Sequence, residues 1–117
     1  MADSAAVARD ALVERLREHL AEEPVTREVA MFGGRAFMVN EKMAVCALKG
    51  GGLLVRIDAQ EHDALARRPG AGPMAMGPER VMGPGWIAVD AEAIDDGEAL
   101  QSWLERALEY NRAVTGR

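Results

Sequence analysis

Apolar side chains near the start of the chain recur every four residues, a spacing typical of an amphipathic helix. The apolar stripe consists of Ala8, Leu12, Leu16 and Leu20. Ser4 is a candidate N-cap, because its hydroxyl can accept a hydrogen bond from a backbone N–H of the first turn. Pro24 disfavours helical backbone in the residue before it, so we expect the helix to end by Glu23.

Between residues 29 and 58, short apolar runs separated by turn residues predict an antiparallel meander of three strands. The first strand consists of residues 29–32 and 36–39, and the other two span residues 43–48 and 53–58. Asn40 and Glu41 predict a tight turn between the first two strands, because asparagine tolerates left-handed backbone. The second strand is apolar on both alternations, which indicates that it is covered on both faces.

The second half of the chain predicts two more strands between two helices. We expect a short helix at residues 59–67 that Asp58 caps, strands at 73–77 and 86–90, and a loop at 78–85. The final helix follows Asp95 or Asp96, and its apolar face comprises Leu100, Trp103, Leu104, Ala107 and Leu108. The predicted fold class is α+β, an antiparallel sheet of about five strands with helices packed on it. The order is α-β-β-β-α-β-β-α within one domain, residues 1–117.

Composition narrows the classes of function. The chain of 117 residues has a net charge of −5 and a pI near 5.0, which argues against direct nucleic-acid binding, because that needs a concentrated basic surface. Cys46 is the single cysteine, so no intramolecular disulfide can form and a cytoplasmic location is expected. No apolar run approaches the ~18 residues of a membrane span, so we expect no membrane association.

Residues 31–43, Met-Phe-Gly-Gly-Arg-Ala-Phe-Met-Val-Asn-Glu-Lys-Met, resemble the signature of TfoX N-terminal domains. In that family a Phe-Gly-Gly segment opens the first strand, and an Asn-Gly-Lys-Met-like turn leads to the second. Further matching segments follow in the expected order at residues 53–58, 73–77 and 85–89, the last with a Trp103-containing helix after it. The resemblance covers about residues 8–112. Glu41 departs from it, because the family has glycine there, and this predicts a turn of another type.

The resemblance implies a secretion-chaperone-like α+β fold. It also implies a relation to regulators of natural competence, which are longer proteins that join this kind of domain to a C-terminal one. This chain resembles a single-domain form without that second domain. The family has no established catalytic residues, so the resemblance implies none here.

Gly33, Gly34 and Arg35 fit two interpretations. Backbone N–H groups and an arginine can cradle a phosphate, but phosphate loops lead from a strand into a helix, and here both flanking segments are extended. We therefore favour a β-bulge or bend at the two glycines.

Seven methionines allow three hypotheses. Met74 and Met76 form a Met-x-Met pair that could supply soft ligands for Cu(I) together with Met82, Cys46 and His62. Methionine is also a common filler of irregular cores, and this pair would share one strand face. Exposed near an edge strand, the same side chains would form an adaptable protein-binding surface. We favour core packing over a metal site and retain the binding surface as a hypothesis.

Cys46 lies within an apolar run, which indicates a buried side chain rather than a nucleophile, since the chain's two histidines are expected on helices. Arg56 interrupts an apolar strand, and we favour a structural ion pair over a partner-binding role for it.

These observations favour a non-enzymatic regulatory or protein-interaction module without a cofactor or metal, with unknown protein partners and a homodimer as one candidate assembly. The candidate interaction or ligand surface comprises Gly33, Gly34, Arg35, Arg56, Met74, Met76 and Trp86. The alternative is a small-ligand-binding protein with a cleft near residues 33–37 and the 78–85 loop.

Overall fold

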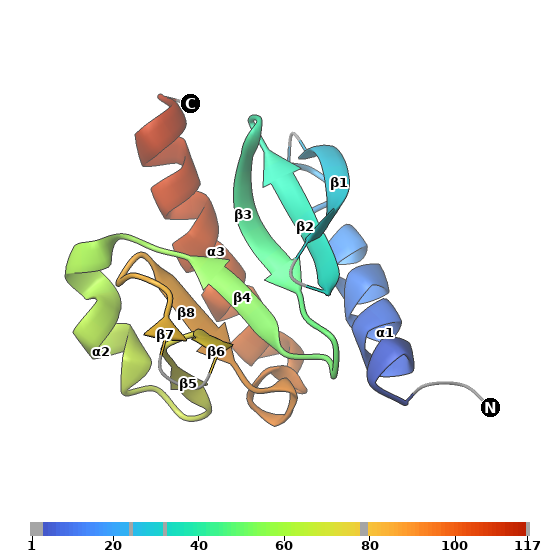
Figure 1. The fold of residues 1–117 in the computed structure, drawn as a ribbon. Coiled ribbons are helices and arrows are strands. Elements are labelled where there is room, and N and C mark those ends of the chain that lie inside the picture. Colours follow the sequence, from blue (N-terminus) through green and yellow to red (C-terminus); the bar gives the residue numbers. More distant parts are fainter. Residues whose placement is uncertain (1–3, 24, 32, 78–79, 117) are drawn as a thin grey trace.

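The computed structural model describes residues 4–23, 25–31, 33–77 and 80–116, and an antiparallel sheet forms the centre of this part of the chain (Figure 1). Its six strands follow the order β1-β2-β3-β4-β8-β5. Their bounds are β1 Val25–Met31, β2 Gly34–Val39, β3 Lys42–Ala47, β4 Leu53–Arg56, β5 Ala71–Gly72 and β8 Trp86–Val89. The α+β class and the broad order of elements expected from the sequence are confirmed.

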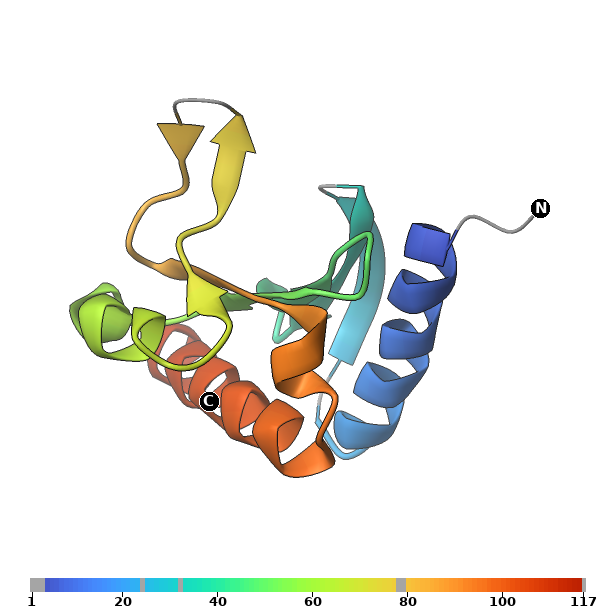
Figure 2. The same ribbon diagram turned by 90° about the horizontal axis from the view of Figure 1, so that it is seen from below.

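Two long helices cover one face of this sheet. Helix α1 spans Ser4–His19 and helix α3 spans Gly97–Thr115, whereas the short α2 (His62–Ala66) lies beyond the strands at one end (Figure 2). Two 3-10 segments, η1 (Ala59–Glu61) and η2 (Ala91–Ile94), precede α2 and α3. The largest side chains of the helix-side core include Leu16, Phe37, Leu53, Ile87, Leu100 and Leu104, which are almost completely buried.

A separate hairpin stands on the opposite side of the sheet. It pairs β6 (Ala75–Gly77) with β7 (Arg80–Val81), and Figure 2 shows it rising away from the two long helices. The expected strand at residues 73–77 is thus present but lies outside the main sheet. The segment expected as a loop contains β7, and Pro78 and Glu79 lie outside the described residues.

The chain reverses between Met31 and Gly34, so the predicted bulge within one strand is wrong. Strands β1 and β2 pair antiparallel with Met31 opposite Gly34, and Gly33 has the left-handed φ of +73°. Strand β1 begins at Val25, before the start expected from the apolar pattern, while Phe32 lies outside the described residues. Gly34 is required by close packing, because a Cβ there would lie 1.9 Å from the Ala47 carbonyl oxygen.

The turn between β2 and β3 is a two-residue hairpin turn, as expected from Asn40 and Glu41. Both residues have positive φ, 51° and 66°, and Val39 pairs with Lys42. This is the backbone pattern of a type I′ turn. The prediction that Glu41 changes the turn type is therefore wrong, and the glutamate adopts the left-handed conformation that glycine would adopt without strain.

Asp58 and Asp96 lie at the helix starts expected from the sequence. The Asp58 carboxylate accepts a hydrogen bond from the Gln60 N–H at 2.9 Å and so caps η1. Gly116 ends α3 in the left-handed conformation. Asp96 holds the N-cap position of α3, but its side chain makes no capping hydrogen bond.

Candidate interaction face and adjoining pocket

The face of the sheet opposite the long helices is apolar. At its centre Ala36, Cys46 and Leu54 are completely buried. Around them lie partly buried side chains: Met31, Met43, Leu48, Met74, Met82 and Trp86. We call these nine residues the methionine face. An antiparallel sheet with helices on one side usually carries polar residues on its other side, so this composition calls for a functional explanation.

Strand register explains how the centre of the face forms. Ala36 lies opposite Cys46, and Cys46 lies opposite Leu54 on the next strand. Because facing residues in antiparallel strands project to the same side, these side chains form one row across β2, β3 and β4. The prediction that the second meander strand is covered on both faces is confirmed, since residues 44–47 are all buried.

The β6–β7 hairpin contributes two of the methionines. The backbone N–H of Met82 donates a hydrogen bond to the Met74 carbonyl at 2.8 Å, which joins the two ends of the hairpin where it leaves the sheet. Both side chains pack against the buried row and stay partly accessible. Methionine is flexible and polarizable, so a rim of this kind can adapt to differently shaped apolar groups.

Cys46 lies beneath this rim. Burial raises the pKa of its thiol to about 11, and its Sγ lies 3.6 Å from the Met31 carbonyl oxygen. A thiol with a raised pKa is protonated at neutral pH and is a poor nucleophile. The predicted role of Cys46 as a buried apolar residue is confirmed.

A pocket of about 230 Å³ adjoins the methionine face where β3 and β4 separate. The two strands pair at three positions, from Val45↔Val55 to Ala47↔Leu53. Beyond them β3 continues beside β2 to Lys42, and β4 continues beside β8 to Arg56. The C-terminal half of α3 lies behind this opening (Figure 1). The lining residues are Lys42, Met43, Arg56, Ala107, Tyr110, Asn111 and Val114.

Arg56 is held at this pocket by aromatic rings. Its guanidinium carbon lies 4.6 Å from the centre of the Trp86 ring and 5.6 Å from that of Tyr110. A methyl group on Gly85 would lie 3.2 Å from Nη1 of Arg56, so this glycine leaves room for the side chain. Within the described ranges no carboxylate pairs with Arg56, and the predicted structural ion pair is replaced by cation–π contacts.

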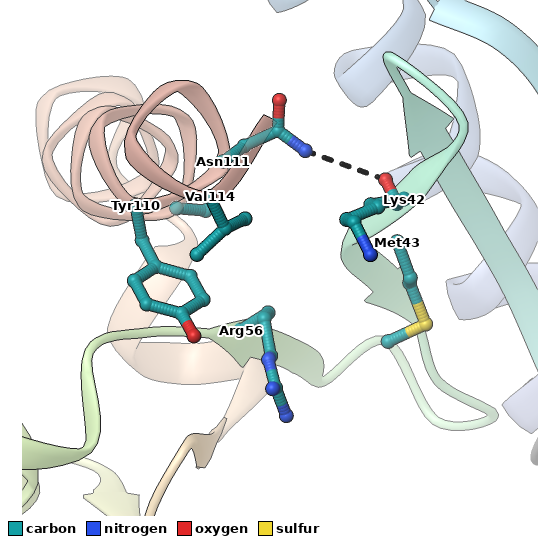
Figure 3. Close-up of a pocket in the computed structure, with 7 residues that line it drawn as sticks. Lys42, Met43, Arg56, Tyr110, Asn111 and Val114 are labelled. Carbon is teal, nitrogen blue, oxygen red and sulfur yellow. Dashed lines mark hydrogen bonds between the residues drawn. The ribbon is translucent and has the colours of Figure 1, made fainter. Parts of the chain in front are cut away.

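Asn111 closes the floor of the pocket. Its side chain is 2% exposed, and its Nδ2 donates hydrogen bonds to the carbonyls of Val39 at 2.9 Å and Lys42 at 3.4 Å. Figure 3 shows Tyr110 and Val114 on one side of the pocket, Lys42 and Met43 on the other, and Arg56 between them. Periodicity places Tyr110 and Asn111 on the final helix, but no local pattern links them to Lys42 or Arg56.

The other candidate residues do not form one surface. Arg35 is exposed on β2 and lies 3.8 Å from Glu28, and the Gly33 carbonyl accepts a hydrogen bond from Arg9 at 3.3 Å. Met74 and Trp86 belong to the methionine face. The side chain of Met76 lies outside the described part of the structure.

The two segments named for the alternative cleft share only part of their side chains on one side of the sheet, because Ala36 lies on the methionine face. Phe37 packs in the helix-side core, whereas Met82 from the 78–85 segment packs on the methionine face. His62, one of the imagined copper ligands, has Nδ1 2.9 Å from the Pro84 carbonyl. In the described part of the chain, no three His, Cys, Asp or Glu side chains are grouped as a metal site. None of the helices described there has the length and apolar character needed to cross a bilayer.

Comparison with known families gives one match, which spans most of the chain. The model of the TfoX N-terminal domain matches residues 5–110. Searches of curated proteins and of solved structures gave no significant match.

Proposed function

The chain belongs to the TfoX N-terminal domain family, and on this basis we propose that it is a non-enzymatic regulatory module that binds a protein partner through the methionine face. The observation that carries the proposal is the apolar character of a sheet face that neither long helix covers. Contiguous apolar surface on a folded domain marks sites of protein association.

The chemistry of the face favours an apolar segment of another polypeptide as the bound group. The rim contains four methionines and a tryptophan, which supply contact area without charge. A nucleic acid would meet a protein of net charge −5, and neutralising phosphates needs clustered cations. A second copy of this chain has the same apolar face and is one form that such a partner could take.

The experiment compares a face variant with a matched variant on the helix side. Met82→Glu places a charge on the methionine face, and Val7→Glu makes a similar change at a valine that is 54% exposed on α1. Tagged wild type and both variants are expressed in the source organism, and the proteins captured with them are identified. Each captured protein is then purified and titrated against the wild type, Met82→Glu and Val7→Glu. Sedimentation velocity of the isolated chain measures self-association in parallel.

We expect the wild type and Val7→Glu to bind the same partner with equal affinity, and Met82→Glu to lose it. Saturating partner should also protect Met43, Met74 and Met82 from oxidation by hydrogen peroxide, because solvent access limits methionine oxidation. A dimer that Met82→Glu dissociates would identify the partner as a second copy. Unchanged affinity in Met82→Glu, or unchanged oxidation at saturation, would refute the proposal.

A further inference from the structure

We propose that the pocket between β3, β4 and α3 binds a small organic anion, with Arg56 and Lys42 holding its carboxylate or phosphate group. This site adjoins the methionine face, because Met43 contributes to both and the Trp86 ring of the face stacks on Arg56. Its recognition would rest on charge, whereas that of the face would rest on apolar contact.

Local charge is the first support for this assignment. The whole chain carries more acidic than basic residues, 19 against 14. The lining residues instead include two cations, Lys42 and Arg56, and no acid. Among the described residues, neither cation forms an ion pair or a side-chain hydrogen bond. Two uncompensated cations at one concave site attract an anion.

The second support is the fixed position of Arg56. Rings on two different elements, Trp86 on β8 and Tyr110 on α3, lie within 6 Å of its guanidinium carbon. Stacking restricts the side chain but leaves its N–H groups free, because ring contacts do not use them. A restrained guanidinium loses little further entropy when it binds a carboxylate or phosphate in a bidentate manner.

The shape and lining of the pocket limit the size of the ligand. Its volume of about 230 Å³ is below the ~300–1,000 Å³ of pockets for drug-sized ligands. Ala107, Val114 and Met43 supply apolar contacts beside the cations, and the Tyr110 hydroxyl is available as a further hydrogen-bonding group. A carboxylic acid or phosphate monoester with a short carbon chain fits these constraints.

Isothermal titration calorimetry with three probes tests this site. Inorganic phosphate, succinate and citrate are titrated into the full chain at fixed ionic strength, with sodium chloride as the reference titrant. Comparison of the three distinguishes a phosphate-selective from a carboxylate-selective pocket. The variants are Arg56→Gln and Lys42→Gln, and the control is Arg67→Gln, which removes the same charge at an exposed position outside the lining set.

We expect at least one probe to bind with a dissociation constant in the millimolar range, since the probes lack contacts tailored to the apolar wall. Arg56→Gln should weaken that binding about tenfold or more, and Lys42→Gln severalfold, as expected for charge-assisted hydrogen bonds. Arg67→Gln should leave it unchanged. Lys42 is exposed in the hairpin, so its variant tests the site even if Arg56→Gln unfolds the protein. The proposal is wrong if no probe binds above the chloride reference, or if Lys42→Gln and Arg67→Gln bind equally well.

Discussion

The side-chain amide of Asn111 in α3 donates a hydrogen bond to the backbone carbonyl of Val39 at 2.9 Å, across 72 positions of sequence. The contact is buried and joins the last helix to the end of β2, next to the turn that leads into β3. Asn111 also accepts a hydrogen bond from the Asn40 amide at 3.3 Å. One polar side chain in an apolar core thus fixes the position of the β2–β3 hairpin against α3.

Replacing Asn111 by alanine should destabilise the fold. The change leaves the buried Val39 carbonyl without this donor, and an unsatisfied buried group costs about 1–3 kcal/mol. Urea unfolding followed by circular dichroism measures the difference. The control is Glu109→Ala on the same helix, whose side chain is exposed, and it should change stability by less than about 0.5 kcal/mol. Equal effects of the two changes would show that the hydrogen bond is not a specific anchor.

The elements that local sequence predicted well are those with one strong period. The final helix was predicted because Leu100, Leu104 and Leu108 recur on a single face, and these three side chains are buried in the structure. The strand expected at residues 43–48 follows from apolar residues on both alternations, and the structure has it as β3, Lys42–Ala47. In both cases the pattern that specifies the element is contained within the element itself.

The errors arise where distant residues decide the local structure. The two glycines at positions 33 and 34 could form a bulge or a turn, and pairing of β1 with β2 selects the turn. Strand β1 begins at Val25 and includes the polar positions 26–28, so apolar content alone does not reveal its first half. The pocket is less predictable still, because Lys42, Arg56 and Tyr110 meet only where β3 and β4 separate.

Alanine substitutions at the two adjacent glycines should have different consequences. In Gly34→Ala the new Cβ would lie 1.9 Å from the Ala47 carbonyl oxygen, and forcing backbone apart should cost about 3 kcal/mol or more. In Gly33→Ala no atom lies within 4 Å of the new Cβ, and the left-handed φ should cost about 1–2 kcal/mol. Thermal unfolding of both variants shows which of them is the less stable. A variant at position 34 that is as stable as that at position 33 would mean that β2 and β3 can separate at little cost.

Glu41→Gly should stabilise the protein. Glutamate at φ +66° is strained, and relief of that strain should exceed the greater unfolded-state entropy of glycine, with a net gain of about 0.5–1 kcal/mol. The ion pair that is lost, Glu41 with Arg27 at 3.7 Å, is exposed on both sides and contributes little. Glu41→Ala separates the two effects, because it removes the carboxylate and keeps the strain. A gain in stability in both Glu41→Gly and Glu41→Ala would show that the gain comes from removing the carboxylate and not from relieving backbone strain.

The contribution of Glu28 to stability should depend on pH. Arg17 donates hydrogen bonds to both carboxylate oxygens, at 2.9 and 2.8 Å, and thereby lowers the pKa of Glu28 below its usual value, with a smaller effect from Arg35. A lowered folded-state pKa stabilises the fold above the unfolded-state value of ~4.3. That stabilisation is lost as pH falls through the folded-state pKa.

Glu28→Gln should therefore lower the urea midpoint at pH 7 and have a smaller effect at acidic pH, because the stabilising charge of Glu28 is lost as pH falls. Arg17 is about half exposed, so the difference at pH 7 should be modest and should shrink in high salt. The control is Glu22→Gln, which removes a carboxylate at an exposed position. A difference in urea midpoint between wild type and Glu28→Gln that stays the same from pH 7 to acidic pH would contradict the role of the charge.

Cys46 offers a direct measure of how often the methionine face opens. Its thiol has a pKa raised to about 11 by burial, compared with about 8.5 for a free cysteine, so at pH 8 its thiolate fraction is lower than that of an unfolded chain by a factor on the order of a few hundred. Lack of access slows reaction further, because a reagent can reach the sulfur only when the overlying side chains move. We expect iodoacetamide to label the native protein at least a hundredfold more slowly than the urea-unfolded protein. Labelling of the native protein at the rate of the unfolded protein would show that the face is open in solution. A partner that binds this face should make labelling slower than it is in the isolated chain.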